Sequence, residues 1–222
     1  MLSDRFKTFF GESSGSNPGR GGRGQDGKEI VTQRQSRGLE QFFFNIRDQV
    51  GLSVLDLGGA TQENVDFIAS LGHRITTQVF LQTLDQTFGK SPPEEQTGAS
   101  LIESFLKQNL DFPDESFDGI LAWDVLQYMS PALLTATVDE LFRIMRPKSY
   151  LLGFFNLDDK VLESPHCKFR IVNANTISLT QRGKRKHAQT FNNRNLERLF
   201  GKFESVKFFL TRESLREVIA RR

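Results

Sequence analysis

A turn of small residues, Asp56-Leu57-Gly58-Gly59-Ala60-Thr61, lies between an apolar run and a segment with helical periodicity. Glycine and alanine in such a turn let a ligand approach the backbone closely. The free amides at the start of a helix attract an anionic group such as a carboxylate. The turn therefore predicts a site for a small ligand, although many phosphate-binding folds contain a similar turn.

Two further pairs of polar residues follow later apolar runs. Asp124 and Tyr128 come after one of them, and we interpret Asp124 as a helix cap or a ligand contact and Tyr128 as a pocket wall. His166 and Cys167 are adjacent in a segment that we expect to be a loop. Neither has a second Cys or a nearby His at metal-ligand spacing, so no metal site is predicted. We interpret them as an ordinary loop histidine and a buried thiol, and no catalytic residue is assigned.

Strands and helices alternate along most of the chain. Apolar runs predict strands over 53–57, 75–80, 117–123 and 150–156, and a closing antiparallel pair of strands over 206–210 and 215–219. Helical spacing predicts helices over 39–50, 81–88, 99–108, 131–145 and 193–200, and a further helix that Thr61 caps. This alternation favours a Rossmann-like, doubly wound α/β fold, with a mostly parallel sheet and helices on both faces. In such a fold a ligand binds at the carboxyl ends of the strands, where strand order reverses.

Three segments occur in an order and at separations that are typical of one protein family. They are Val54-Leu55-Asp56-Leu57-Gly58-Gly59, Asp114-Glu115-Ser116-Phe117-Asp118-Gly119-Ile120-Leu121 and Arg146-Pro147-Lys148-Ser149-Tyr150-Leu151-Leu152. In these segments the chain resembles the class I S-adenosylmethionine-dependent methyltransferases, in the broad group that modifies small molecules. The resemblance implies S-adenosylmethionine as cofactor and methyl transfer to a small-molecule acceptor.

The resemblance also implies which residues form the cofactor crevice. They are Asp56, Gly58, Gly59, Ala60, Gln78, Val79, Asn109, Leu110 and Asp124. Asp56 would help to hold the amino group of the methionine end, while Gly58 and Gly59 would allow close backbone approach. Asn109 would reach the adenine through its amide. The helix expected over 99–108 stands where the family usually has a strand.

Several positions depart from the family pattern. The family places glycine at three alternating positions of the turn, where this chain has Gly58, Ala60 and Gln62. Val79 stands where an acid normally accepts the two ribose hydroxyls, and strand alternation points Gln78 to the opposite face. No acid stands where the family often binds the adenine amino group. The alternative hypothesis is therefore a catalytically inactive methyltransferase-fold binding or interaction protein.

Bulk composition is that of a soluble globular protein. The 222 residues can bury a substantial core, and they are 37% hydrophobic and 25% charged, with 21 Phe that we expect to fill much of the core. Cys167 is the one cysteine, which excludes an internal disulfide and favours a reducing compartment. No apolar stretch approaches the roughly 20 residues of a membrane helix. We therefore expect a cytoplasmic location and no membrane partner.

The two ends differ in composition from the middle of the chain. Residues 1–29 are expected to form a flexible arm rich in Gly, Ser and Arg, and residues 30–222 a single methyltransferase-like domain. Residues 182–222 contain twelve Lys and Arg against four Asp and Glu. We interpret this excess as a solvated surface that balances an acidic body, with nucleic-acid binding as the alternative. A small-molecule acceptor is the expected partner, and the sequence does not indicate an oligomeric state.

Overall fold

The computed structural model describes residues 30–222 except 90–95, 157–162, 188 and 212–214. The arm expected over 1–29 lies outside the described residues. The strands are β1 (Val31–Gln35), β2 (Ser53–Asp56), β3 (Arg74–Thr77), β4 (Phe117–Trp123), β5 (Met145–Asn156), β6 (Glu163–Asn173), β7 (Thr176–Lys186), β8 (Ser205–Leu210) and β9 (Leu215–Arg221). The helices are α1 (Arg37–Ile46), α2 (Gln62–Ser70), α3 (Phe80–Phe88), α4 (Ala99–Leu110), α5 (Pro131–Ile144) and α6 (Asn193–Leu199), with a short 3-10 helix η2 (Val125–Tyr128).

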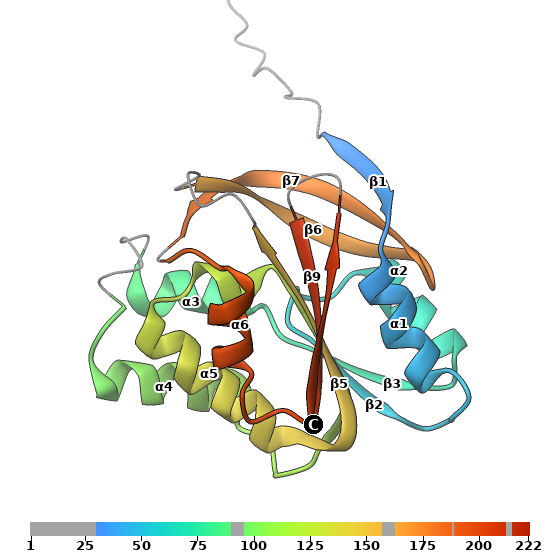
Figure 1. Cartoon of the computed structure of the whole chain (residues 1–222), viewed down its shortest axis with the longest axis horizontal. Helices are drawn as coiled ribbons and strands as arrows, with labels where there is room; N and C mark the ends of the chain where they lie inside the picture. Colours follow the sequence, from blue (N-terminus) through green and yellow to red (C-terminus); the bar gives the residue numbers. More distant parts are fainter. Residues whose placement is uncertain (1–29, 90–95, 157–162, 188, 212–214) are drawn as a thin grey trace, which may run out of the picture.

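The main sheet has six strands in the order β3-β2-β4-β5-β9-β8. The first four are parallel, and β9 and β8 extend them by antiparallel pairing. Helices α1 and α2 pack on one face, and α3 to α6 pack on the other (Figure 1). This arrangement confirms the predicted doubly wound α/β fold. Strand order reverses between β2 and β4, so the carboxyl ends of these strands form the crevice where a ligand is expected.

Phenyl rings fill both sides of the sheet, as the composition predicted. On one side Phe42 of α1 packs on β4 at Gly119, where a Cβ would lie 2.6 Å from the ring. On the other side Phe80 and Phe105 pack edge to face with centroids 5.0 Å apart. The hydroxyl of Thr61 accepts a hydrogen bond from the backbone of the third residue beyond it, so the predicted cap of α2 is confirmed.

The segment between β3 and β4 contains α3 and α4. Helix α4 confirms the helix predicted over 99–108, where the family usually has a strand. Among the described residues β3 is therefore the edge strand of the main sheet. The segment that follows β3 consequently packs beside the sheet as two helices.

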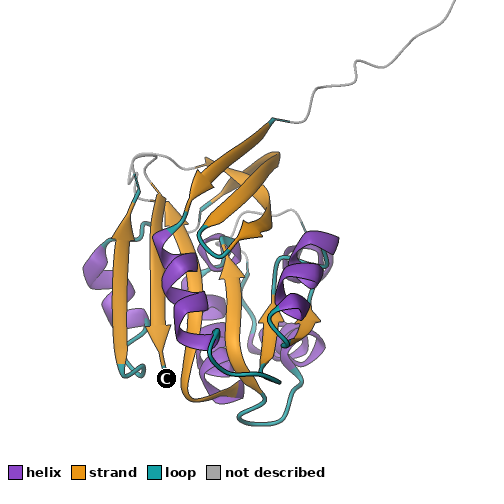
Figure 2. Cartoon of the chain, turned by 90° about the vertical axis from the view of Figure 1, so that its right-hand side faces the viewer, coloured by secondary structure: helices purple, strands orange, loops and turns teal. Residues whose placement is uncertain are grey.

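A second sheet, which we call the roof sheet, consists of β1, β7 and β6 in that order. It lies across the top of the main sheet, above the carboxyl ends of its parallel strands (Figures 1 and 2). The sequence did not predict β1. The expected loop at His166 and Cys167 is wrong, because both residues belong to β6, and the basic run that begins at Arg182 continues β7.

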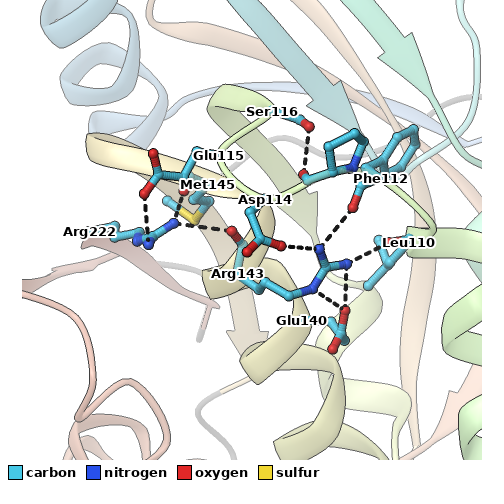
Figure 3. Close-up of polar contacts among 10 residues, drawn as sticks. Leu110, Phe112, Asp114, Glu115, Ser116, Glu140, Arg143, Met145 and Arg222 are labelled. Atoms are coloured by element: carbon cyan, nitrogen blue, oxygen red, sulfur yellow. Dashed lines mark hydrogen bonds and ion pairs between the residues drawn. The ribbon is translucent and has the colours of Figure 1, made fainter.

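At the amino ends of the parallel strands, Arg143 near the end of α5 fixes the loop that leads into β4. Its guanidinium donates to the backbone carbonyls of Leu110 and Phe112, at 3.3 and 2.9 Å, and pairs with the carboxylates of Asp114 and Glu140 (Figure 3). These contacts join the ends of α4 and α5 to the turn before β4. The family-like segment around this turn therefore has a structural role here.

Several cations of the basic C-terminal region pair with acids elsewhere in the fold. The pairs with acids outside the region are Arg185 with Asp85, Lys202 with Asp139 and Arg222 with Glu115, while Arg221 pairs with Glu204 inside it. These contacts agree with the interpretation that basic residues at this end balance an acidic body.

Candidate ligand-binding crevice

Asp56 ends β2 and has no exposed surface. Its Oδ1 accepts hydrogen bonds from the Gly58 N–H at 2.8 Å and the Trp123 indole N–H at 2.7 Å, and its Oδ2 accepts one from the Asn64 amide at 2.8 Å. Burial raises the pKa of Asp56, and the three donors oppose that shift. The carboxylate therefore fixes the shape of the turn and does not reach the crevice.

Trp123 ends β4 and is the one tryptophan of the chain. Its φ of +48° is uncommon for a residue other than glycine. The indole covers Gly58 so closely that a Cβ there would lie 2.7 Å from its Cδ1. It also stacks on Phe169 of β6, with ring centroids 5.2 Å apart and planes 4° apart. The indole thus connects the turn after β2 to the roof sheet.

Asp124 is buried, and the Tyr128 hydroxyl donates to its Oδ2 at 2.9 Å. Burial raises the pKa of Asp124 to about 7, although hydrogen bonds from Tyr128 and from the Cys167 N–H lower it. Burial and the nearby Asp124 charge raise the pKa of Tyr128, which stays protonated. Asp124 occupies the N-cap position of η2, but its side chain makes no cap hydrogen bond there.

The free edge of β6 is hydrogen-bonded to side chains of the crevice. Asn64 of α2 contributes two of these bonds: its Nδ2 donates to the Phe169 carbonyl at 3.4 Å, and its Oδ1 accepts from the Ile171 N–H at 2.8 Å. The same Nδ2 also bonds Asp56. One buried amide therefore joins β2, α2 and the roof sheet.

Two other crevice residues bond β6 further along the same edge. The Cys167 N–H bonds Asp124, and the Tyr128 hydroxyl lies 3.4 Å from the Pro165 carbonyl. Pro165, Cys167, Phe169 and Ile171 alternate along the strand, so their polar backbone groups point the same way. These contacts supply partners for an edge that would otherwise be open.

A cavity of ≈ 250 Å³ lies between the turn after β2, the end of β4 and the roof sheet. Of the nine predicted residues it brings together Gly58, Gly59, Ala60, Val79 and Asp124. The remaining lining residues come from the turn after β2, the end of β4, α3, η2 and the roof sheet: Leu57, Trp123, Phe80, Leu81, Gln82, Val125, His166, Cys167, Lys168, Phe169 and Arg182.

The other four predicted residues do not line this cavity. Asp56 lies beneath the turn, and Gln78 donates its backbone N–H to the Asp56 carbonyl at 2.8 Å. Asn109 is buried and turns its amide back to the Phe105 carbonyl at 2.7 Å. Leu110 is buried in the core around α4. The predicted adenine contact through Asn109 is therefore not made in this arrangement.

Sequence reasoning did not place the roof residues in the crevice. Their contribution depends on pairing between β6 and β7 and on the fold of that hairpin over β2 and β4. One local signal was present: Lys168, Phe169, Arg170 and Ile171 alternate polar and apolar, which is typical of a half-buried strand.

Residues 55–153 match the sequence model of a methyltransferase domain. The segment from β2 to β5 is therefore similar to a methyltransferase domain. This confirms the resemblance on which the sequence interpretation rested. No curated protein matches the chain in sequence.

Several solved structures are similar to this methyltransferase-fold chain. One is an S-adenosylmethionine-dependent methyltransferase from Archaeoglobus fulgidus, at 16% identity over 83% of this chain and 91% of that chain, with a TM-score of 0.47. Another, from Methanosarcina mazei, has 19% identity over 78% and 93%, with a TM-score of 0.46. A third is the Burkholderia thailandensis 1,6-didemethyltoxoflavin-N1-methyltransferase with bound 1,6-didemethyltoxoflavin and S-adenosylhomocysteine, at 15% identity over 83% and 76%, with a TM-score of 0.44.

S-adenosylmethionine is the cofactor that the resemblance implies, and the crevice fits one end of it. Gly59 has a φ of +84°, and with Gly58 and Ala60 it presents backbone at the cavity, as the methionine end requires. The nucleoside end does not fit. Val79 is 51% exposed and cannot accept a ribose hydroxyl, while Asn109 is turned away. The cavity is also below the roughly 300–1,000 Å³ of typical ligand pockets.

Proposed function

We propose that the protein is a methyltransferase that uses S-adenosylmethionine to methylate a small-molecule acceptor. The observation that carries the proposal is the meeting of Gly58, Gly59, Ala60, Val79 and Asp124 around one cavity at the switch point of the sheet. All five lie inside the segment that matches the methyltransferase domain. A small acceptor suits a cavity that the roof sheet covers, because a polymer needs an open groove.

The proposal includes the organisation and location of the protein. Residues 30–222 act as one domain, because buried hydrogen bonds from Asn64 tie the roof sheet to α2 and β2. The protein acts in the cytoplasm, as its single cysteine suggests. Among the described residues, no helix is both long and apolar enough to cross a membrane.

Binding of S-adenosylhomocysteine and S-adenosylmethionine tests the proposal. We expect heat in titration calorimetry and a change in fluorescence, because the single tryptophan, Trp123, lines the cavity. Circular dichroism must show that the protein is folded. A folded protein that gives no signal with either ligand at millimolar concentration would contradict the proposal.

The second candidate function is a methyltransferase-fold binding protein without activity. Val79 in place of the ribose acid favours it, together with the occupation of the Asp124 carboxyl by Tyr128. The variant Val79→Asp adds an acceptor at the exposed position. A bond to a charged group is worth roughly 1.5–3 kcal/mol, so we expect about tenfold or more gain in affinity for S-adenosylhomocysteine.

The two candidate functions predict different affinities of the unmodified protein for S-adenosylhomocysteine. A methyltransferase binds the ligand before the substitution, and Val79→Asp then strengthens the binding. Val79→Asn serves as a control, since it adds a neutral acceptor of similar size. Micromolar affinity in the unmodified protein would exclude the second candidate.

A further inference from the structure

A groove lies between α5 and α6, on the face of the main sheet that α3 to α6 cover (Figure 1). Its volume is ≈ 600 Å³, which is within the range of typical ligand pockets. None of the described residues that line it also lines the cavity beside the turn after β2. The groove is therefore a second candidate site for a ligand, separate from the crevice.

Two helix faces form the walls of the groove. The lining residues on each helix recur at intervals of three and four, which places them on one side of that helix. They are Pro131, Leu134, Thr135 and Asp139 on α5, and Asn195, Arg198 and Leu199 on α6. Leu196 of α6 turns to the core instead, where it is buried. This spacing puts Arg198 on the side of α6 that faces α5.

The floor of the groove is apolar. Leu134 and Phe191 are 2% and 4% exposed, and Leu199 is half-buried. Phe191 packs against Phe155, with ring centroids 4.9 Å apart, and its carbonyl accepts a hydrogen bond from Arg216 at 3.0 Å. Apolar ligand surface that is buried against such side chains is removed from water, which is favourable. The floor therefore suits an aliphatic chain.

Gln189 contributes a hydrogen-bond donor that the protein does not use. Its side-chain Nε2 is buried and has no hydrogen-bond partner. Most buried polar groups in proteins have partners, and one that lacks a partner costs free energy. Because Gln189 lines the groove, an oxygen of a bound ligand would supply the missing acceptor.

The charged residues of the groove leave one cation without a carboxylate. Lys202 pairs with Asp139 at 2.5 Å, so these two charges offset each other. Asp139 is the one acid among the described residues that line the groove. In the part of the chain that the structure describes, no carboxylate pairs with Arg198. A guanidinium binds a carboxylate through paired hydrogen bonds, so Arg198 favours an anionic ligand.

We propose that this groove binds a small amphipathic anion, an aliphatic chain that carries one carboxylate. The chain packs on Leu134, Phe191 and Leu199, and the carboxylate accepts hydrogen bonds from the two unused donors, Arg198 and Gln189. The site goes beyond the proposed methyl transfer and does not depend on it, because the groove and the crevice are lined by different residues.

Titration calorimetry of the full-length protein with octanoate, 1-octanol and octylamine tests the charge preference. The three probes have the same chain and differ in the head group. We expect octanoate to bind about fivefold or more tightly than the other two, because only its head group is an anion. Equal binding of the three probes, or no heat with octanoate at millimolar concentration, would overturn the proposal.

Variants of the two helices locate the site. We expect Arg198→Gln to weaken octanoate binding about threefold to fivefold and to leave 1-octanol unaffected, since an exposed cation contributes less than a buried one. Arg194→Gln is the matched control, because Arg194 is an exposed arginine of the same helix that does not line the groove. Thr135→Trp fills the groove from α5 and should abolish binding of both probes. Circular dichroism checks that each variant is folded. If Arg198→Gln binds octanoate as its control does, or Thr135→Trp as the unmodified protein does, the proposal fails.

Two further measurements exclude other occupants and another location. A second copy of the chain would also cover an apolar groove, so sedimentation measures the mass of the protein with and without octanoate. We expect the same mass in both, whereas a dimer that octanoate or Thr135→Trp dissociates would make the groove an interface and overturn the proposal. We also expect octanoate to bind equally well in the presence of saturating S-adenosylhomocysteine. Competition between them would place octanoate in the crevice, while octanoate binding in a protein that does not bind S-adenosylhomocysteine would reject the methyl transfer alone.

Discussion

At the scale of single residues, the crevice depends on polar groups that are satisfied inside the protein. Asp56 uses its oxygens to bind Gly58, Asn64 and Trp123, so the acid that the family assigns to the cofactor holds the turn together here. Trp123 then occupies the space that Gly58 leaves. Asp56 and Gly58 belong to the family-like turn, but the hydrogen-bond partners of the Asp56 carboxylate are internal.

Asp124 should make stability depend on pH. Its pKa is raised by burial from 3.8 to about 7, despite hydrogen bonds from Tyr128 and the Cys167 N–H and the positive charge of Arg185. Between about pH 4 and 7 the unfolded chain has lost this proton while the folded protein keeps it. The contribution of Asp124 to the free energy of unfolding therefore falls as pH rises through this window.

Urea unfolding of the wild type and Asp124→Asn at pH 5 and pH 7 measures this effect. The asparagine keeps an acceptor for Tyr128 and cannot ionise, so we expect the wild type to lose stability relative to the variant on going to pH 7. Other buried acids, such as Glu217, titrate in both proteins and cancel in the difference. A difference that is the same at both pH values would contradict the assignment.

At the scale of elements, the decisive feature is the edge of β6. Its backbone groups bond Asn64, Asp124 and Tyr128, which come from α2 and from the segment after β4. The strand is therefore attached to the crevice along several residues. Enlarging the cavity toward β6 would therefore break some of these bonds.

Asn64→Ala should loosen this attachment. The change leaves a buried Asp56 oxygen and the Ile171 N–H without their partner, which costs about 1–3 kcal/mol of unfolding free energy for each such group. Because the contact of Phe169 with Trp123 also weakens, acrylamide should quench Trp123 more strongly in the folded variant. Gln62→Ala on the same helix is the control, since Gln62 is exposed and its side chain bonds the exposed Asp66. Unchanged quenching in Asn64→Ala would contradict the role of Asn64.

Sequence predicted the floor of the crevice better than its roof. The floor comes from β2, β4 and the turn after β2, where apolar runs and small residues give strong local signals. The roof comes from β1, β6 and β7, whose polar residues give weak strand signals. β1 pairs with the distant β7, and the β6–β7 hairpin reaches the crevice only through contacts with β2, α2 and the end of β4. Lys168 and Arg182 were missed as cavity residues for that reason.

At the scale of the whole molecule, the two ends of the parallel strands in the main sheet have different roles. The cavity and the roof sheet lie at the carboxyl ends of these strands. At the amino ends, Arg143 and Arg222 contact the turn before β4 (Figure 3). Stability and ligand binding can therefore be changed separately.

Arg143→Ala should test this separation. It removes the bonds to the carbonyls of Leu110 and Phe112 and the pairing with Asp114, and we expect a loss of about 1–3 kcal/mol in unfolding free energy. Arg143→Lys keeps the charge but not the planar fork, so an intermediate loss is expected. Affinity for probes that Trp123 reports should be unchanged in both variants. Altered affinity in the folded variants would show that the amino ends of the strands influence the cavity at their carboxyl ends.

The pairing of Val31 with Thr180 bears on how the protein is made. A ribosome releases β1 long before β7, so the first strand has to wait while β2 to β5 are synthesised. Contacts between such distant segments form slowly. The nascent chain consequently passes through a stage in which β2 and β4, the floor of the crevice, are synthesised but the roof strands that line its other side are not.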